Sequence, residues 1–441
     1  MMQKATLMKK AIIFPIVLIV LSLGAITFAW FTLAPKARVE KFTAEIRANS
    51  GIEISLDGVS FYSFIKNADI VSQVKNNLQV GTGEITLDAV TTVNGYSAFK
   101  LLDFTTHPGI PVLSDVPEVS AENPGKWVWF YLYFRTPEPG VWVYLTDDTY
   151  VTSDGWRWYT DVEYNDAAGF GSIVPGKPKM IYAANCLRMS FLTCELDTDK
   201  IGSIHPVSGD FKSVVIYELD PTYAVQPNPR DVNQRLDDHL KPYGSIDYFR
   251  AKKTGSASGI DLFEHFTDAV LPERILNNEH LVSVTDLEGD LTNKAAIVQL
   301  DAYHEESGYY YGAVKAQMWI EGWDPDCYNA ILKDQLQVSL KFTSTTQAPG
   351  IAPVEIDTET EYEIVYFYDH TLGTMTHANP TVVKAHELPY FLLPAALNGH
   401  TFQGWYWDEG YAQACLFIPR DPEYVISGGK KVIRLYAKFA G

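Results

Sequence analysis

Residues 127–134 read WVWFYLYF, and this stretch constrains the fold more than any other. Each position is aromatic or aliphatic, so a strand formed here has no polar face and must be covered on both sides. After the turn sequence PEPG at residues 137–140, the apolar stretch VWVYL at residues 141–145 predicts a second strand. The two strands indicate a core built from sheets, with residues 127–134 as a central strand of a sandwich.

Strand-like segments continue on both sides of this pair. Apolar and polar residues alternate over residues 42–48, which is the two-residue period of a half-buried strand. Further strands are expected at residues 52–56, 85–87, 187–192, 213–217, 296–300, 312–320 and 336–342. The loops between them are long, which favours a jelly-roll-like β-sandwich domain with long insertions over residues 30–343. The best helix candidate is residues 262–276, where apolar residues recur at helical spacing.

The C-terminal part divides into two segments of different composition. Residues 344–361 (STTQAPGIAPVEIDTETE) are rich in Thr, Pro and Glu and lack periodicity, which predicts a linker. Residues 362–441 beyond it predict a small, mainly β module that folds as a unit of its own. Its extended segments are expected at residues 362–368, 382–392, 401–407 and 431–439.

The chain starts with a basic segment and then an apolar one. Lys4, Lys9 and Lys10 precede residues 11–29, which carry no charge. This order is typical of an export signal, with cleavage expected near Ala29. As a helix the apolar run would measure about 28 Å, enough to span a bilayer, so an uncleaved anchor at residues 1–29 stays open as an alternative. Both predict an extracellular or cell-surface protein that meets the membrane through this segment, before or without cleavage.

Composition argues against some classes of function. The chain has 35 basic and 54 acidic residues, and its formal net charge of −19 opposes nucleic-acid binding, which needs a cationic surface. Four Cys in 441 residues are too few for a disulfide framework. Cys186 with Cys327 is the only pairing that we consider, and free buried thiols are the expected state.

The sequence contains no familiar catalytic motif. His304 and His386 each precede a Glu but lack the second His, four residues on, that a zinc-protease motif needs. The stretch GSASG at residues 255–259 has Ala where a serine hydrolase carries its nucleophile. We therefore expect a non-enzymatic protein without catalytic residues or a bound cofactor. The alternative is a secreted glycan-binding protein or hydrolase whose site assembles only in three dimensions.

One candidate metal site is acidic. Glu321, Asp324 and Asp326 crowd a Gly-Trp-Asp-Pro turn. Oxygen-rich loops of this kind bind Ca²⁺ in many extracellular proteins. Solvated turn carboxylates, or a helix cap ahead of residues 328–332, are the plainer interpretation.

A second candidate site is aromatic. Trp156, Trp158 and Tyr159 follow a turn, and aromatic faces stack on sugar rings. Aromatic residues are also common in strands, so packing in the core or on the sheet surface is the alternative. The first interpretation predicts glycan ligands at the cell surface.

The residues after Ala29 suggest a route to self-assembly. Once cleavage frees the chain, residues 30–48 would form an alternating strand with nothing before it. Such a strand can complete the sheet edge of a neighbouring copy, and head-to-tail addition without closure would build a filament. Pairing of the strand within its own domain is the alternative.

Residues 399–408 (GHTFQGWYWD) and 435–439 (LYAKF) resemble the Listeria–Bacteroides repeat, a β-grasp-like module related to internalin B-repeats. The chain departs from that pattern at Asp369-His370, where a Gly-rich turn is usual, and it has the repeat once. The resemblance covers residues 362–441 and implies a module of surface proteins.

The larger N-terminal part has a looser resemblance. The segments TFAWFT (residues 27–32), IEISLDG (52–58), LDAVTT (87–92), CLRMSF (186–191) and WIEGWDPDC (319–327) are similar to exported Firmicutes proteins processed by a SipW-type signal peptidase. That group includes the TasA and camelysin-like matrix proteins, whose mature domain is a jelly roll. The resemblance implies adhesion, or assembly of an extracellular matrix or fibre, with protein or glycan ligands.

Overall fold

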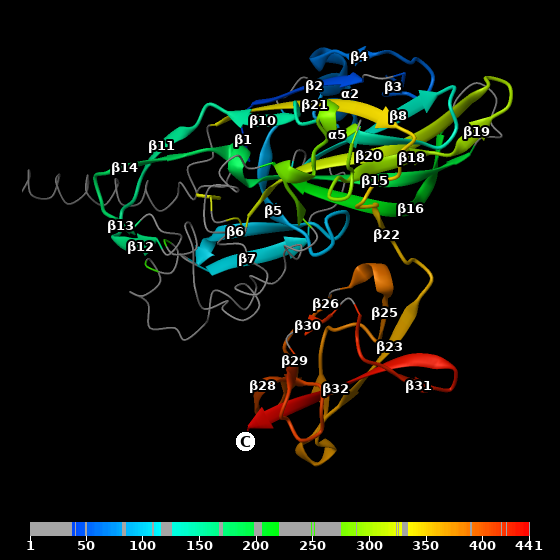
Figure 1. Ribbon diagram of the computed structural model, residues 1–441. Helices are drawn as coiled ribbons and strands as arrows, with labels where there is room; N and C mark the ends of the chain where they lie inside the picture. The colour runs from blue at the N-terminus through cyan, green and yellow to red at the C-terminus, as the bar shows by residue number, and fades with distance from the viewer. Residues whose placement is uncertain are drawn as a thin grey trace, which may run out of the picture.

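The computed structural model is mainly β (Figure 1). It describes residues 38–39, 41–48, 51–81, 85–107, 110–115, 126–166, 171–197, 205–219, 248, 251, 275–287, 289–322, 324, 326–328, 334–388, 390–415, 417–419 and 421–440. The export segment predicted at residues 1–29, its cleavage point at Ala29 and most of the helix predicted at residues 262–276 lie outside this set. Within it, no helix is both long enough and apolar enough to cross a bilayer.

The larger of two facing sheets is centred on β20 (Tyr309–Glu321). The main strand order is β17-β16-β15-β20-β5-β6-β7, and β8 (Val128–Thr136) pairs with β20 in antiparallel register. The central strand predicted at residues 127–134 is confirmed as β8. The other members are β1 (Arg38–Val39), β3 (Glu53–Ser55), β5 (Leu87–Thr91), β6 (Lys100–His107), β7 (Ile110–Asp115), β15 (Leu187–Asp197), β16 (His205–Glu218), β17 (Ile275–Leu276), β19 (Ala302–His304) and β22 (Val354–Glu355).

The smaller sheet has the order β18-β9-β21-β2-β4, with β10 (Tyr150–Ser153) also paired to β21. Its members are β18 (Ala296–Leu300), β9 (Val141–Leu145), β21 (Gln335–Thr345), β2 (Lys41–Ala48) and β4 (Phe64–Ile65). The helix α2 (Asn67–Asn77) contacts β2 and β8 and buries Ile70 and Val74.

The core lies between the two sheets. The Phe342 ring on β21 meets the Phe134 ring on β8 with centroids 5.1 Å apart, and the Phe191 ring on β15 with centroids 6.4 Å apart. On β8, alternate side chains from Val128 to Phe134 are fully buried on this side. We call this two-layered part, residues 38–345, the sandwich-like unit.

A hairpin-like arm extends from the sandwich-like unit on the left of Figure 1. It contains the pair β11 (Trp156–Tyr159) and β14 (Pro178–Ile181), and the pair β12 (Tyr164–Asp166) and β13 (Gly171–Ile173). The 3₁₀ turn η1 (Ala183–Cys186) joins β14 to β15. Two short helical segments, η4 (Asn278–His280) and α5 (Val284–Leu287), lie ahead of β18.

The C-terminal unit, residues 361–440, has a sheet of order β25-β23-β32-β28-β29, with β31 on β32. Its strands are β23 (Glu361–Phe367), β24 (Met375–Thr376), β25 (Val382–Lys384), β26 (Tyr390–Phe391), β27 (Ala396–Leu397), β28 (Thr401–Tyr406), β29 (Ala414–Cys415), β30 (Phe417–Ile418), β31 (Val425–Ser427) and β32 (Lys430–Ala440), with the 3₁₀ turns η6 (His370–Leu372) and η7 (Ala385–Glu387). Trp405, 3% exposed, belongs to its core, and its indole N–H donates to the Leu393 carbonyl at 2.9 Å.

The segment predicted as a linker, residues 344–361, is bound to the sandwich-like unit over much of its length. Its first two residues end β21, and β22 pairs with β16. The backbone N–H groups of Gly350 and Ile351 donate to the carbonyls of Leu291 and Lys294 at 2.9 and 3.0 Å. These contacts make residues 350–356, here called the strap, a part of the sandwich-like unit.

Candidate functional site

The carboxylate of Glu321 lies in a buried ion network. Arg188 on β15 is fully buried, and its Nε and Nη1 atoms lie 2.8 and 2.9 Å from carboxylate oxygens of Glu218 and Glu321. The Trp319 indole N–H donates to the same Glu321 oxygen at 3.2 Å. Burial acts to lower the pKa of Arg188, but the charges of Glu321 and Glu218 outweigh it and raise the pKa, so the guanidinium stays charged.

The adjacent turn is held by its own hydrogen bonds. Asp324 is fully buried, and its carboxylate accepts the backbone N–H of Asp326 at 2.8 Å. The side-chain amide of Asn185 donates to the carboxylate of Asp326 at 3.4 Å. In the part of the chain that the structure describes, no group of three or more His, Cys, Asp or Glu residues could hold a metal ion. Glu321, Asp324 and Asp326 therefore do not form the Ca²⁺ site considered from the sequence, and the Glu321 carboxylate is paired with Arg188 instead.

The three aromatic residues of β11 have different surroundings. Trp158 is 7% exposed, and its ring packs on those of Tyr248 and Tyr328 with centroids 4.8 and 4.7 Å away. Its proposed role in glycan stacking is wrong, because neither ring face is open to a ligand. Trp156 and Tyr159 are 42% and 54% exposed.

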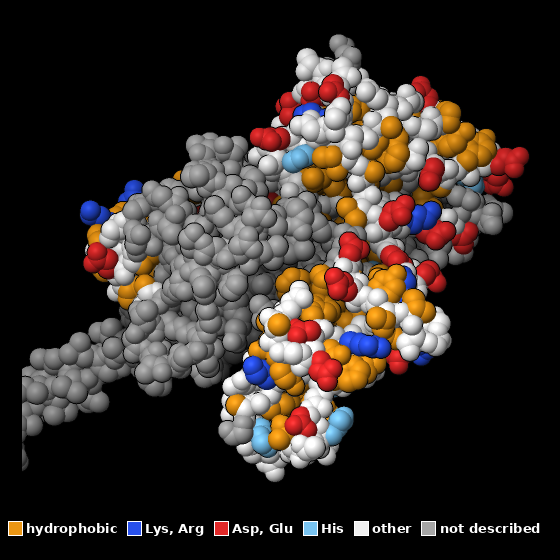
Figure 2. Space-filling model, turned by 60° about the horizontal axis from the view of Figure 1, so that its bottom comes forward, with side chains coloured by type: hydrophobic (Ala, Val, Ile, Leu, Met, Phe, Trp, Pro, Cys, Tyr) orange, Lys and Arg blue, Asp and Glu red, His pale blue; other side chains and the backbone are white. Residues whose placement is uncertain are grey.

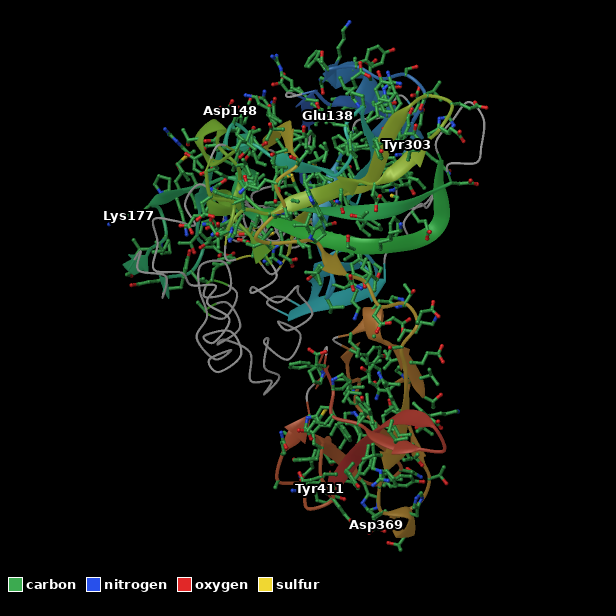
Figure 3. All side chains as sticks on the ribbon, turned by 45° about the vertical axis from the view of Figure 1, so that its right-hand side comes forward. Glu138, Asp148, Lys177, Tyr303, Asp369 and Tyr411 are labelled. Atoms are coloured by element: carbon green, nitrogen blue, oxygen red, sulfur yellow. The ribbon has the colours of Figure 1, made fainter. Side chains whose placement is uncertain are left out.

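Tyr159 belongs to an exposed strip on one face of the arm. The pairing of β11 with β14 places Arg157 opposite Met180 and Tyr159 opposite Pro178, and all four are exposed. Tyr182 continues this strip, and its ring lies so close to Gly155 that a Cβ there would overlap it. In Figure 3, Lys177 marks the outer end of the arm. The strip is an accessible surface for stacking, whereas Trp156 lies on the opposite face of the arm.

The predicted assembly strand is placed within its own domain over its described part. β2 runs parallel to β21, with Lys41 opposite Gln335 and Ala48 opposite Phe342. On its other side, β4 pairs only with Ile46 and Arg47. The alternation predicted for residues 42–48 is confirmed where side chains are described, since Ala44, Ile46 and Ala48 are buried.

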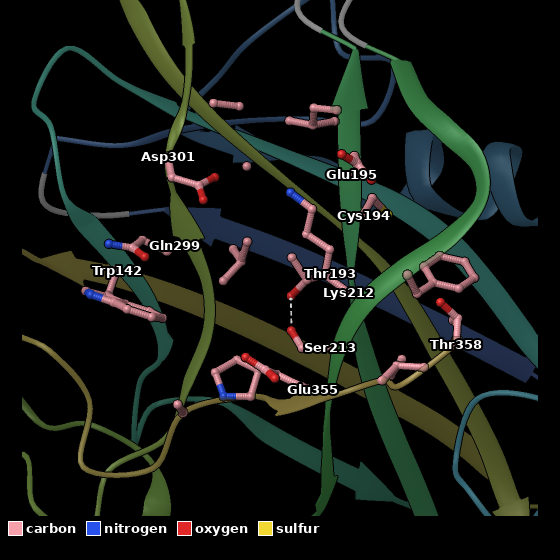
Figure 4. Close-up of a pocket in the computed structure, with 18 of the residues that line it drawn as sticks. Trp142, Thr193, Cys194, Glu195, Lys212, Ser213, Gln299, Asp301, Glu355 and Thr358 are labelled. Atoms are coloured by element: carbon pink, nitrogen blue, oxygen red, sulfur yellow. Dashed lines mark hydrogen bonds between the residues drawn. The ribbon is translucent and has the colours of Figure 1, made fainter. Parts of the chain in front are cut away.

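An open groove of about 920 Å³ lies beside the strap (Figure 4). β15, β16, β18 and the strap supply most of its walls, and Trp142 and Tyr303 also line it. Lys212 points into the groove in Figure 4, and the Ser213 hydroxyl donates to the Thr193 hydroxyl at 2.9 Å. The lining carries several carboxylates but no His among the described residues, so it offers polar contacts without a hydroxyl–imidazole pair.

Sequence reasoning missed this groove and the ion network because both join segments far apart in the chain. A single signal was present: Arg188 stands inside the apolar segment CLRMSF, and a charge at such a position needs a partner when the strand is buried. The sequence alone does not show which residue is that partner.

Apolar side chains also reach the surface of the C-terminal unit, among charged ones (Figure 2). Val382 at one sheet edge is 47% exposed, and Ile426 on β31 is 66% exposed. Val382 lies on β25 and Ile426 on β31, two short strands at margins of the sheet, and such edge strands can pair with another chain.

No family model matches the chain, and neither the curated proteins nor the solved structures that we compared with it include a match.

Proposed function

We propose that this is an exported surface or matrix protein that works by adhesion or assembly, without catalysis. In this proposal the sandwich-like unit is jelly-roll-like and akin to the TasA and camelysin-like group. The C-terminal unit is a β-grasp-like Listeria–Bacteroides repeat. The sequence motifs quoted above support both assignments, and the observation that carries the proposal is the position of β2.

β2 is suited to donation between copies. It is the first long strand of the described chain, and the described strand before it is the short β1, which pairs with β5 at Arg38 and Val39. Its full length pairs only with β21, because β4 covers just two of its residues. Ala44, Ile46 and Ala48 insert into the core at alternate positions, and side chains at such positions give a donated strand its specificity.

Exchange of β2 between copies would preserve every contact that the strand makes within one chain. The monomer and the assembly would then differ mainly in which copy supplies the strand, as in domain swapping. Head-to-tail exchange that does not close on itself gives a fibre. Adhesion would use the surfaces that remain exposed, including the edges of the C-terminal unit.

A pair of introduced thiols tests this proposal. The Ser339 hydroxyl donates to the Glu45 carboxylate at 3.0 Å, so Glu45→Cys and Ser339→Cys in one chain would place two thiols side by side between β2 and β21. After oxidation of the concentrated mature protein, exchange gives a ladder of covalent multimers on a non-reducing gel. Each single substitution is the matched control and should give no such ladder.

Only internally bridged monomer from the double variant, at every concentration, would refute assembly through β2. Export is tested separately by N-terminal sequencing of native protein recovered from the cell surface or medium. A sequence starting near residue 30 supports export with cleavage, and intact protein confined to the cytosol contradicts export.

Glycan binding is the second candidate, and the exposed strip of the arm favours it. Tyr159→Ala should weaken binding on a glycan array, whereas Tyr150→Ala, at a similarly exposed tyrosine on β10, should leave it unchanged. Equal binding by both variants and the unsubstituted chain would remove this candidate.

A further inference from the structure

Two of the four free Cys residues lie against each other in the core. Cys186 ends η1, Cys327 follows the turn after β20, and both are buried members of the same apolar cluster. The thiol of Cys186 donates to the carbonyls of Tyr182 and Ala183 at 4.0 and 3.5 Å. Burial and, after it, the neighbouring Cys327 raise the pKa of Cys186. Two cysteines from segments this far apart in the chain are thus brought to the same part of the core.

The neighbouring residues fix this approach. Leu187, next to Cys186, is opposite Ile320 in the β15–β20 ladder. Past the end of β20, the chain turns back, and the Cys327 N–H donates to the Asp324 carbonyl at 2.9 Å. On the other flank, the Asn185 amide reaches the Asp326 carboxylate at 3.4 Å. The pair is therefore held by backbone pairing on one side and by a side-chain bond on the other.

From this geometry we infer that Cys186 and Cys327 form a disulfide bond in the exported protein. This inference rests on the export that is part of the proposed function, because disulfides persist in oxidising compartments. The other two cysteines, Cys194 and Cys415, belong to separate clusters in different units, so neither has a described cysteine partner.

Oxidation of the two cysteines releases two electrons, and these pass to an external disulfide. That disulfide belongs either to a thiol oxidoreductase or to a small molecule. One cysteine thiolate attacks it and forms a mixed disulfide, and the second cysteine then displaces the external thiol. One S–S bond forms between Cys186 and Cys327, the external S–S bond breaks, and its two sulfurs leave as thiols carrying the two protons. Burial holds the pKa of the Cys186 thiol well above its usual range. A buried, protonated thiol reacts slowly, so the bond forms during folding.

The bond would anchor the arm. η1 joins the arm to β15, and Tyr328, next to Cys327, accepts a hydrogen bond from Lys179 on β14 at 2.8 Å. The bridge closes a loop longer than a hundred residues, for which the entropic restriction of the unfolded chain is large. Reduction should lower the Tm of the sandwich-like unit by about 10 °C.

Peptide mapping under non-reducing conditions tests the pairing. Trypsin places Cys186 in peptide 180–188, Cys327 in peptide 316–333 and Cys194 in peptide 189–200, so the three are resolved. Two samples are alkylated before digestion: native protein recovered from cells, and purified full chain refolded in a glutathione redox buffer. The expected product in both is 180–188 joined to 316–333, lighter by two hydrogen atoms than the separate peptides.

The two samples distinguish a failure of the disulfide pairing from a failure of the proposed export. The joined peptide in the refolded chain but not in the native protein supports the pairing and contradicts export. Alkylated Cys186 and Cys327 in the refolded chain, or a bond from either to Cys194 or Cys415, overturns the pairing.

Substitutions give a second readout. Cys327→Ser should abolish the dependence of Tm on reductant, while Cys194→Ser should preserve it. An equal response to reductant in the Cys327→Ser protein would also overturn the pairing. If this variant does not fold, the peptide map of the unsubstituted chain still decides.

Discussion

The sandwich-like unit and the C-terminal unit each bury one face of a sheet, but they are stabilised by different kinds of contact. The first buries an ion network in which Arg188 joins Glu218 and Glu321 from neighbouring strands. The second packs its core around Trp405 and fixes its turns with partly exposed carboxylates such as Asp408. Non-local ionic contacts specify one unit, whereas local turn geometry specifies the other. A destabilising substitution should therefore have different effects in the sandwich-like unit and in the C-terminal unit.

The largest expected effect breaks the ion network. Arg188→Met would leave two buried carboxylates without their cation, and removal of one partner from a buried pair costs about 3–5 kcal/mol. We expect that loss in the free energy of unfolding of the sandwich-like unit, measured by urea denaturation with hydrogen exchange to separate the units.

The matched control is Arg135→Met, because Arg135 pairs with Glu53 at 2.6 Å on a partly exposed surface. Exposed pairs contribute about 0–1 kcal/mol, so this variant should remain close to the unsubstituted protein. Equal losses in the two variants would mean that burial of the Arg188 network does not distinguish the sandwich-like unit.

The next effect is confined to the C-terminal unit. Trp405→Leu removes core volume and the indole hydrogen bond to Leu393, and we expect a loss of about 2–3 kcal/mol. Hydrogen exchange should rise across residues 361–440 and stay unchanged in β8 and β20. Trp407→Leu, at a partly buried neighbour, is the control and should cost less. A matching rise in β8 would show that the units unfold together.

This contrast also explains how far the sequence could be read. In the C-terminal unit the informative residues are close together: Gly404 takes a φ of +141° at a bulge, and Trp405 follows it into the core. In the sandwich-like unit an unbroken apolar run predicted β8 and alternation predicted β2, because both patterns are local properties of the sequence. Strand order is not local, and neither are the contacts that depend on it.

The same reason explains the errors. Trp158 is indistinguishable in sequence from its exposed neighbours, and only packing against Tyr248 and Tyr328 closes its faces. Glu321 belongs to an acidic turn in sequence, but Arg188, which forms an ion pair with it, comes from another strand. The residue types in one segment do not predict which side chain from a distant segment will pack against it.

The strap provides a test of where the first unit ends. A Cβ at Gly350 would overlap the backbone of Thr292, so Gly350→Ala should push the strap away from the sandwich-like unit at a cost of about 1–3 kcal/mol. Gly289→Ala is the control, since a Cβ there meets only an ordinary contact, 3.4 Å from the Thr285 carbonyl oxygen. Faster hydrogen exchange in residues 350–356 is expected only in the first variant. If hydrogen exchange in residues 350–356 does not change in the Gly350→Ala protein, this segment behaves as a free linker.

The smallest effect concerns the turn carboxylate of the C-terminal unit. The backbone N–H groups of Gln413 and Ala412 donate to Asp408 and lower its pKa below the ordinary 3.8. The unfolded chain therefore binds a proton at a higher pH than the folded chain does. The stabilisation is complete above the ordinary value and is lost as pH falls through the lower folded-state value.

Acid should thus weaken the C-terminal unit below about pH 4, and Asp408→Asn should reduce that pH dependence while barely changing the profile of the sandwich-like unit. Glu409→Gln removes the same charge from an exposed neighbour and serves as the control. The measurement is the free energy of unfolding of residues 361–440 between pH 3 and 7. Identical profiles for the two variants would assign the acid sensitivity to net charge, and the turn geometry of Asp408 would then no longer distinguish this unit from the sandwich-like unit.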